Sequence, residues 1–234
     1  MKSLLALLLI TLTLGLAPQQ VSASDHVILA GGPALRKWEN LRVDRDRHDR
    51  WWANFIRGST MRMDNIRAAY GPSAKLIWLV HRKGYIARAR EDGKPYTTWI
   101  TEQATKRGAK LIWVEGGPSI IKAINSRPAR SITTFDFFGH SNRHCFLLDY
   151  SSEIIGACTA WLHEKDLYKI KRSVFAPNAI CKSWGCHTGE SMNVFWRAAT
   201  GREIIGAHGK TDYAALSQGK MPAINGSWVF RAPR

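Results

Sequence analysis

The sequence predicts an α/β fold, with a single three-layer domain around a mostly parallel sheet of Rossmann-like topology. Three observations lead to this prediction. Short, continuous apolar runs alternate with segments of helical spacing, a pattern typical of parallel strands that helices cover on both faces. Glycine-rich turns follow several of these runs. The sequence shows no internal repeats or low-complexity linkers, so we expect one domain in the 234-residue chain.

The first half of the chain supplies three expected strands, which are the apolar runs Val27–Ala30, Leu76–Val80 and Leu111–Val114. Aromatic residues recur at helical spacing within residues 34–70 and predict one or two amphipathic helices there. A helix over 97–107 is expected to end at Gly108, since glycine readily adopts the conformation that follows a last helical turn. A short helix over 120–125 follows the third strand.

The second half continues the alternation of strands and helices. Strands are expected at Ile132–Phe138, Cys145–Tyr150, Ala179–Trp184 and Ile204–Gly209, the second of them as one arm of a hairpin. Helices are expected over 162–170 and 191–199. The tail over 218–234 is expected to add an edge strand.

Composition sets limits on the class of protein and on its partners. An apolar content of 45% with 22% charged residues excludes a disordered chain. The net charge of +16 predicts attraction to an anionic surface or polymer. The basic residues are scattered, and the alternating acids and bases of residues 44–47 are typical of a solvated helix face, so a nucleic-acid partner is not expected.

The N-terminal segment has the features of a secretory signal peptide. Lys2 precedes an apolar stretch from Leu4 to Ala17, and Val21-Ser22-Ala23 has the small-residue pattern of a cleavage site. The apolar stretch is shorter than the roughly 18–20 residues of a membrane span. We therefore expect a signal peptide over 1–23, a domain over 24–234 without a transmembrane segment, and a periplasmic or extracellular location.

The chain has four cysteines, at positions 145, 158, 181 and 186. An oxidising compartment permits disulfides, and four cysteines allow three pairings. Cys145 with Cys158 is the pair we favour if a disulfide forms. The spacing of the cysteines and histidines matches no known zinc motif, so neither a metal nor a cofactor is expected.

Two of the expected strands are followed by turns that contain a histidine or a cysteine, side chains able to take part in catalysis. Gly139-His140-Ser141-Asn142 follows the strand that ends at Phe138, and Gly185-Cys186-His187-Thr188-Gly189 follows the next core strand. Functional residues of parallel sheets gather beyond the carboxyl ends of the strands. A thiolate is a strong nucleophile, a nearby imidazole can protonate a leaving amine, and backbone N–H groups in sharp turns can bind an oxyanion.

These turns, with the hairpin and helix expected between them, resemble the caspase-like cysteine peptidases, which include the metacaspases and the CHAT domains. Cys186-His187-Thr188-Gly189 is similar to the Cys-His-Ser-Gly motif of metacaspases. The resemblance implies a caspase-like topology for the domain. It also implies an exported peptidase acting on peptides or proteins, with Cys186 as nucleophile, His140 as acid/base, and an oxyanion hole formed by the N–H groups of Ser141 and Cys186.

Two positions depart from the family pattern. Ser141 stands where the family usually has glycine, which would cost about 1 kcal/mol or more if the backbone there needs a positive φ. Trp184 stands where metacaspases carry an aspartate that binds a basic substrate side chain. The sequence therefore does not assign the preferred substrate side chain.

Five further residues are secondary candidates for the site. Asp136 and Asp212 can line a substrate pocket, as can Asp149. His208 is the second candidate for the catalytic histidine, and His187 is expected to cap the next helix together with Glu190.

Two other functions stay open on the sequence. One is a catalytically inactive caspase-like module that binds an acidic polymer or a partner protein through its basic surface. The other is a cysteine-dependent amidase that acts on cell-envelope material with the same Cys186 and His140.

Overall fold

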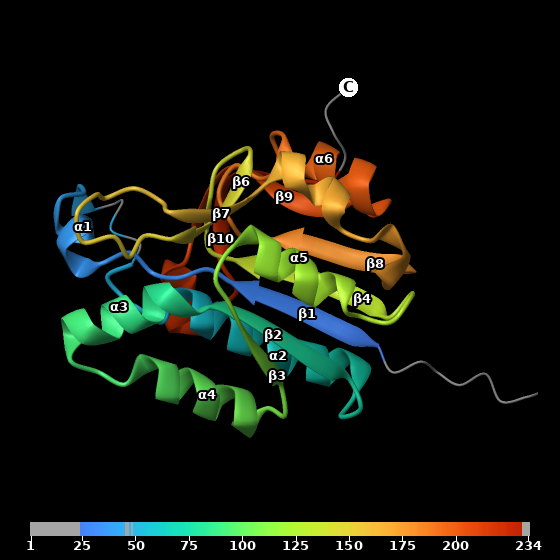
Figure 1. Ribbon diagram of the computed structural model, residues 1–234, viewed down its shortest axis with the longest axis horizontal. Helices are drawn as coiled ribbons and strands as arrows, with labels where there is room; N and C mark the ends of the chain where they lie inside the picture. The colour runs from blue at the N-terminus through green and yellow to red at the C-terminus, as the bar shows by residue number, and fades with distance from the viewer. Residues whose placement is uncertain (1–23, 45–46, 48, 231–234) are drawn as a thin grey trace, which may run out of the picture.

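A computed structural model describes residues 24–44, 47 and 49–230 of the chain. A seven-stranded sheet in the order β10-β9-β8-β4-β1-β2-β3 forms its middle layer (Figure 1). The parallel strands are β1 (Asp25–Ala30), β2 (Lys75–His81), β3 (Lys110–Val114), β4 (Ile132–Phe138), β8 (Phe175–Ser183) and β9 (Ile204–Asp212). The edge strand β10 (Ala223–Val229) runs antiparallel to β9.

Helices cover both faces of this sheet. Along β1, Val27 and Leu29 enter one core, and Ile28 and Ala30 enter the other, because successive side chains of a strand point to opposite faces. The first core lies under α5 (Gly117–Asn125), α6 (Met192–Thr200) and the 3₁₀ helices η2 (Glu164–Lys169) and η3 (Arg172–Val174). The second lies under α2 (Asn54–Tyr70), α3 (Arg82–Asp92), α4 (Tyr96–Lys106) and η4 (Ala214–Gln218). The predicted three-layer α/β domain is therefore confirmed.

A small antiparallel sheet lies beyond the carboxyl end of β1. It consists of β5 (His140–Ser141), β6 (Cys145–Asp149) and β7 (Ala160–His163), in that order. The N–H of Gly32 donates to the carbonyl of Leu148 at 2.8 Å, which ties the end of β1 to β6. A side chain at Gly32 would meet the backbone of Gly84 in α3, so a glycine is needed for this close approach.

Residues 34–70 hold α2 and a shorter helix, α1 (Arg36–Asn40), as the aromatic spacing predicts. The helix over 97–107 is also present as α4, and Gly108 after it has a φ of 58°. The tail contributes β10 as its expected edge strand. The expected signal peptide over 1–23 lies outside the described residues, and no described helix has the length and apolarity to cross a membrane.

Two parts of the secondary structure differ from the sequence-based expectation. The helix expected over 162–170 is instead the end of β7 followed by η2, because Leu162 pairs with Phe146 in the small sheet and is fully buried there. The helix α3 was not expected at all. Its buried residues are Gly84, Tyr85 and Arg88, so it lacks the apolar stripe by which an amphipathic helix is recognised.

The four cysteines are free thiols, so the structure has no Cys145–Cys158 disulfide, the pair favoured if one forms. Cys145 begins β6 opposite His163, whereas the thiol of Cys158 donates to the carbonyl of Ala160, which pairs with Asp149 at the other end of β6. The two thiols therefore belong to opposite ends of the hairpin.

Candidate active site

The pairing of β4 with β8 places the two predicted turns side by side. Phe137 is in register with Ser183, and the N–H of Trp184 donates to the carbonyl of Phe137 at 2.8 Å. His140 and Cys186 each come three residues after this register pair, at the same edge of the sheet. The two residues that the sequence assigns to catalysis therefore follow neighbouring strands at equivalent positions.

A hydrogen bond joins the two turns directly. The hydroxyl of Ser141 donates to the carbonyl of Cys186 at 2.7 Å. A side chain at Gly185 would collide with the Ser141 hydroxyl group, so the glycine before the cysteine allows the turns to approach.

The thiol of Cys186 is held by the next strand, β9. The N–H of Thr211 donates to its Sγ at 3.3 Å, and the Thr211 hydroxyl oxygen lies 3.4 Å from the same sulfur. Thr211 is only 3% exposed. A backbone N–H directed at sulfur stabilises negative charge there, which is the charge that a nucleophilic thiolate carries.

The imidazole of His140 is fixed by a carboxylate and two aromatic rings. Its Nε2 lies 2.6 Å from Oδ2 of Asp49. The rings of Phe55 and Tyr150 each pack against it in an edge arrangement, with centroid distances of 5.1 Å. Because the Asp49 contact occupies Nε2, Nδ1 is the nitrogen left for proton transfer.

Asp49 lies against the His140 ring as the carboxylate of a catalytic triad lies against its histidine. Burial raises its pKa, but the charge of His140 and the hydrogen bond from the ring outweigh burial, so the pKa of Asp49 is held below its ordinary 3.8. The carboxyl group is therefore ionised at neutral pH and able to stabilise an imidazolium.

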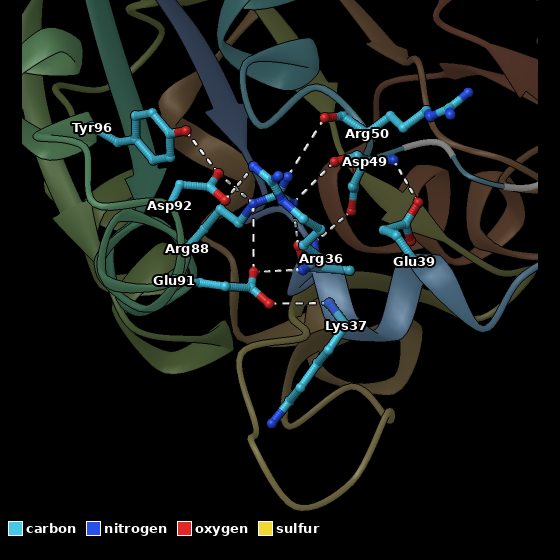
Figure 2. Close-up of polar contacts among 10 residues, drawn as sticks. Arg36, Lys37, Glu39, Asp49, Arg50, Arg88, Glu91, Asp92 and Tyr96 are labelled. Carbon is cyan, nitrogen blue, oxygen red and sulfur yellow. Dashed lines mark hydrogen bonds and ion pairs between the residues drawn. The ribbon is translucent and has the colours of Figure 1, made fainter.

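A buried polar network fixes the loop that carries Asp49 (Figure 2). The carboxylate of Asp49 accepts the N–H of Ala34 at 2.5 Å, and the N–H of Asp49 donates to Glu39 at 2.8 Å. Arg88 is 1% exposed and donates to the carbonyls of Ala34 and Asp49, at 2.8 and 3.0 Å. Its Nε lies 2.7 Å from Asp92, which balances its charge.

Sequence reasoning missed Asp49. It follows a segment of alternating acids and bases that predicts a solvated helix face, and nothing in its spacing relates it to His140, 91 residues later. Its environment is the opposite of the expected one, because its side chain is 1% exposed. Only the return of the chain after α1 brings it to the imidazole.

The pairing of β5 with β6 sets the direction of the Ser141 N–H, one of the two groups of the predicted oxyanion hole. The N–H of Asn142 donates to Cys145, and hydrogen-bonded pairs alternate along an antiparallel ladder. The neighbouring Ser141–Phe146 pair is thus of the non-hydrogen-bonded kind, which directs the Ser141 N–H away from β6. Among the described residues other than glycine, only Arg130 and His187 have a positive φ, so serine causes no left-handed strain at position 141.

Asp136 and Asp149 do not line a substrate pocket. Asp136 is buried within the layers and bonds the Arg62 guanidinium at 2.8 Å and the Trp184 indole at 3.0 Å. Burial raises its pKa despite the opposing charge of Arg62. Asp149 is likewise buried and accepts hydrogen bonds from the Ser151 N–H and the Thr159 hydroxyl. Their side chains are engaged in structural contacts.

Asp212 does line a cavity. This cavity of about 350 Å³ lies between the loop after α1 and the end of β9, and its lining comprises Asp44, Arg47, Arg50, Trp51, Asn54, Asp212, Tyr213, Ala214 and Ser217. It begins one residue beyond Thr211, which contacts the thiol. A larger cavity of about 610 Å³ lies against α4 and β3. The strand β3 is the outer strand on the opposite side of the sheet from β9 and β10.

The remaining two candidates are His208, within β9, and His187, in the turn that contacts β9. His208 is an exposed residue of β9 paired with Ser227 of β10. The prediction that His187 and Glu190 cap the next helix is wrong. That helix, α6, begins at Met192. Glu190 instead accepts hydrogen bonds from the His187 ring and from the N–H of Gly209. Among the described residues, no cluster of three or more side chains could hold a metal ion.

Replacement of Asp49 by asparagine is expected to weaken the fold in a pH-dependent manner. The folded-state pKa of Asp49 is lowered, so its contribution to stability is complete above the ordinary value and is lost as pH falls through the folded value. We expect Asp49→Asn to reduce the free energy of unfolding by about 2 kcal/mol at pH 7, with a smaller loss below about pH 4. Urea denaturation across this pH range measures the difference, with Asp166→Asn, whose side chain is 40% exposed, as control. An equal loss at every pH would contradict the role of the charge.

Arg88→Leu is expected to destabilise the protein by about 3–5 kcal/mol, because it leaves the buried carbonyls of Ala34 and Asp49 without this donor and removes one of the partners of Asp92. Arg88→Lys is expected to recover little of this, since one ammonium cannot reproduce the forked guanidinium contacts. Arg90→Leu in the same helix is the matched control, because the Arg90 side chain is 76% exposed. Equal thermal denaturation curves for the two leucine variants would refute the network's importance.

Comparison of the chain with protein-family models, with curated proteins and with solved structures finds no match. The chemistry of the site therefore rests on the geometry of its own residues.

Proposed function

We propose that the protein is a cysteine peptidase of caspase-like fold, in which Cys186 is the nucleophile, His140 the acid/base and Asp49 the group that orients His140. The observation that carries this proposal is the register of β4 and β8, which brings His140 and Cys186 to one edge of the sheet at equivalent positions. The positions of these residues after consecutive core strands support the caspase-like topology that the sequence resemblance implies.

In the proposed reaction, the Cys186 thiolate attacks the carbonyl carbon of a peptide bond. The N–H groups of Ser141 and Cys186 stabilise the oxyanion that forms. The imidazolium of His140 gives its proton to the leaving amine, which breaks the C–N bond and leaves a thioester on Cys186. His140 then takes a proton from the water that hydrolyses the thioester, and the thiolate is restored.

The cavity next to Thr211 is the proposed place for a substrate side chain. Its lining carries both signs of charge, and Asp44 lies 2.5 Å from Arg47 within it. Aromatic surface from Trp51 and Tyr213 adds apolar contact. This lining favours a large side chain with a polar end, whereas Trp184 is buried and bonded to Asp136 instead of reaching a substrate.

The proposed setting is outside the cytoplasm. The expected signal peptide over 1–23 supports export, and the net charge of +16 supports attraction to an anionic surface or polymer near the substrate.

Selective alkylation of Cys186 is the first expected result. Burial raises the pKa of Cys145 to about 11 and that of Cys181 to about 12, and it also raises the pKa of Cys158. Iodoacetamide at pH 7 should therefore modify Cys186 about tenfold or more faster than the other three thiols. Mass spectrometry of the digested protein identifies the labelled position. An unlabelled Cys186 would contradict the proposed function.

Peptide cleavage is the direct test. A library of unstructured peptides is incubated with the wild-type protein and with Cys186→Ala, His140→Ala and His208→Ala. We expect the two site variants to lose about 10³-fold or more in kcat/KM, because nucleophile and base act as a unit. His208→Ala should keep full activity. Loss of cleavage in His208→Ala with retention in His140→Ala would transfer the acid/base role to His208.

A further inference from the structure

The turn that carries Cys186 contains a strained residue. His187 follows the nucleophile directly and has a φ of 61°, in the left-handed region. A residue with a Cβ adopts this conformation at a steric cost, and such strain is kept where the surrounding structure holds it in place. A glycine would avoid this cost, whereas His187 brings a side chain that bonds Glu190.

That side chain bonds a carboxylate that is shared with β9. The Nδ1 of His187 donates to Oε1 of Glu190 at 2.6 Å, and the N–H of Gly209 donates to the same oxygen at 3.1 Å. The guanidinium of Arg143 lies 3.3 Å from the other oxygen. The Glu190 side chain is 14% exposed, and burial raises its pKa, but the hydrogen bonds from His187 and Gly209 outweigh burial and lower the pKa.

Backbone contacts continue this link between the turn and β9. The N–H of His187 donates to the carbonyl of Gly209, and the N–H of Gly189 donates to the carbonyl of Ala207, both at 2.8 Å. Gly209 is therefore held twice, through its carbonyl by His187 and through its N–H by Glu190. Its position relative to the turn is fixed.

The position of Gly209 also affects the contact that the Cys186 sulfur makes with β9. Thr211 comes two residues after Gly209 in β9, a separation of about 6.6 Å along a strand. Its N–H is the donor to Sγ of Cys186 at 3.3 Å. Any slip of β9 at Gly209 would move this donor away from the sulfur.

We propose that His187 and Glu190 are positioning residues, which lock the nucleophile turn to β9 and so keep the Cys186 thiolate against the N–H of Thr211. This inference rests on the proposed function of Cys186. Neither residue touches the reacting atoms, so their effect is on the orientation and charge stabilisation of the sulfur, and substrate binding is left nearly unchanged.

The test compares three substitutions of His187 and one of Glu190. His187→Gly removes both the backbone strain and the bond to Glu190, and His187→Ala removes the bond alone. His187→Asn keeps a side-chain N–H donor in a residue that tolerates the left-handed conformation. Glu190→Ala removes the shared acceptor, and Glu153→Ala, whose side chain is 67% exposed, is the matched control.

Two rates are measured for each variant, the alkylation of Cys186 by iodoacetamide and the kcat for a cleaved peptide, together with KM and the melting temperature. We expect His187→Gly, His187→Ala and Glu190→Ala to lower both rates about tenfold with KM nearly constant. His187→Asn is expected to restore most of both rates, and Glu153→Ala to match the wild type.

The outcomes separate this inference from the proposed function. Wild-type rates in His187→Gly, or no recovery in His187→Asn, would overturn the positioning role while Cys186 remains a reactive nucleophile. An inert Cys186 in the wild-type protein would overturn the proposed function and the inference together. If Glu190→Ala fails to fold, the comparison of His187→Gly with His187→Asn still decides the result.

Discussion

The parallel pairing of β4 with β8 is the constraint on which the rest of the site depends. It is stable because both faces of the two strands are covered, with Phe135 and Cys181 in one core and the buried Asp136–Trp184 contact on the other side. A shift of one residue would exchange these faces, so the register is strongly specified. The same register fixes where the chain after each strand begins, and hence places His140 and Cys186 at the same end of the sheet.

Around this pair, each neighbouring segment contributes one group at the carboxyl end of the sheet. The loop after α1 brings Asp49 to the imidazole, and β9 brings the N–H of Thr211 to the sulfur. Burying Asp49 and Arg88 would be costly for isolated charges, but here every charge has a close partner or backbone acceptor. The polar network thus holds the His140 ring in a fixed orientation.

The sequence was informative wherever one local pattern decided the structure. Continuous apolar runs identify the core strands because a strand buried on both faces has no polar side, and Ile132–Phe138 has the predicted bounds. The local apolar pattern failed to predict the secondary structure where contacts with other segments decided it. Leu162 and His163 pair with β6, and only the 3₁₀ helix η2 follows them where a longer helix is expected. The helix α3 buries Arg88 where a helix normally buries apolar side chains.

The sequence by itself determined the layered α/β fold and the candidate residues His140 and Cys186, since a glycine-flanked turn after an apolar strand is a local signal. Only the tertiary structure decided which groups surround them. Asp49, Thr211 and Glu190 come from separate segments, and their roles depend on distances between side chains that chain spacing does not encode. Burial then decides their chemistry, because an acid in a charged segment becomes an orienting carboxylate only when packing removes it from water.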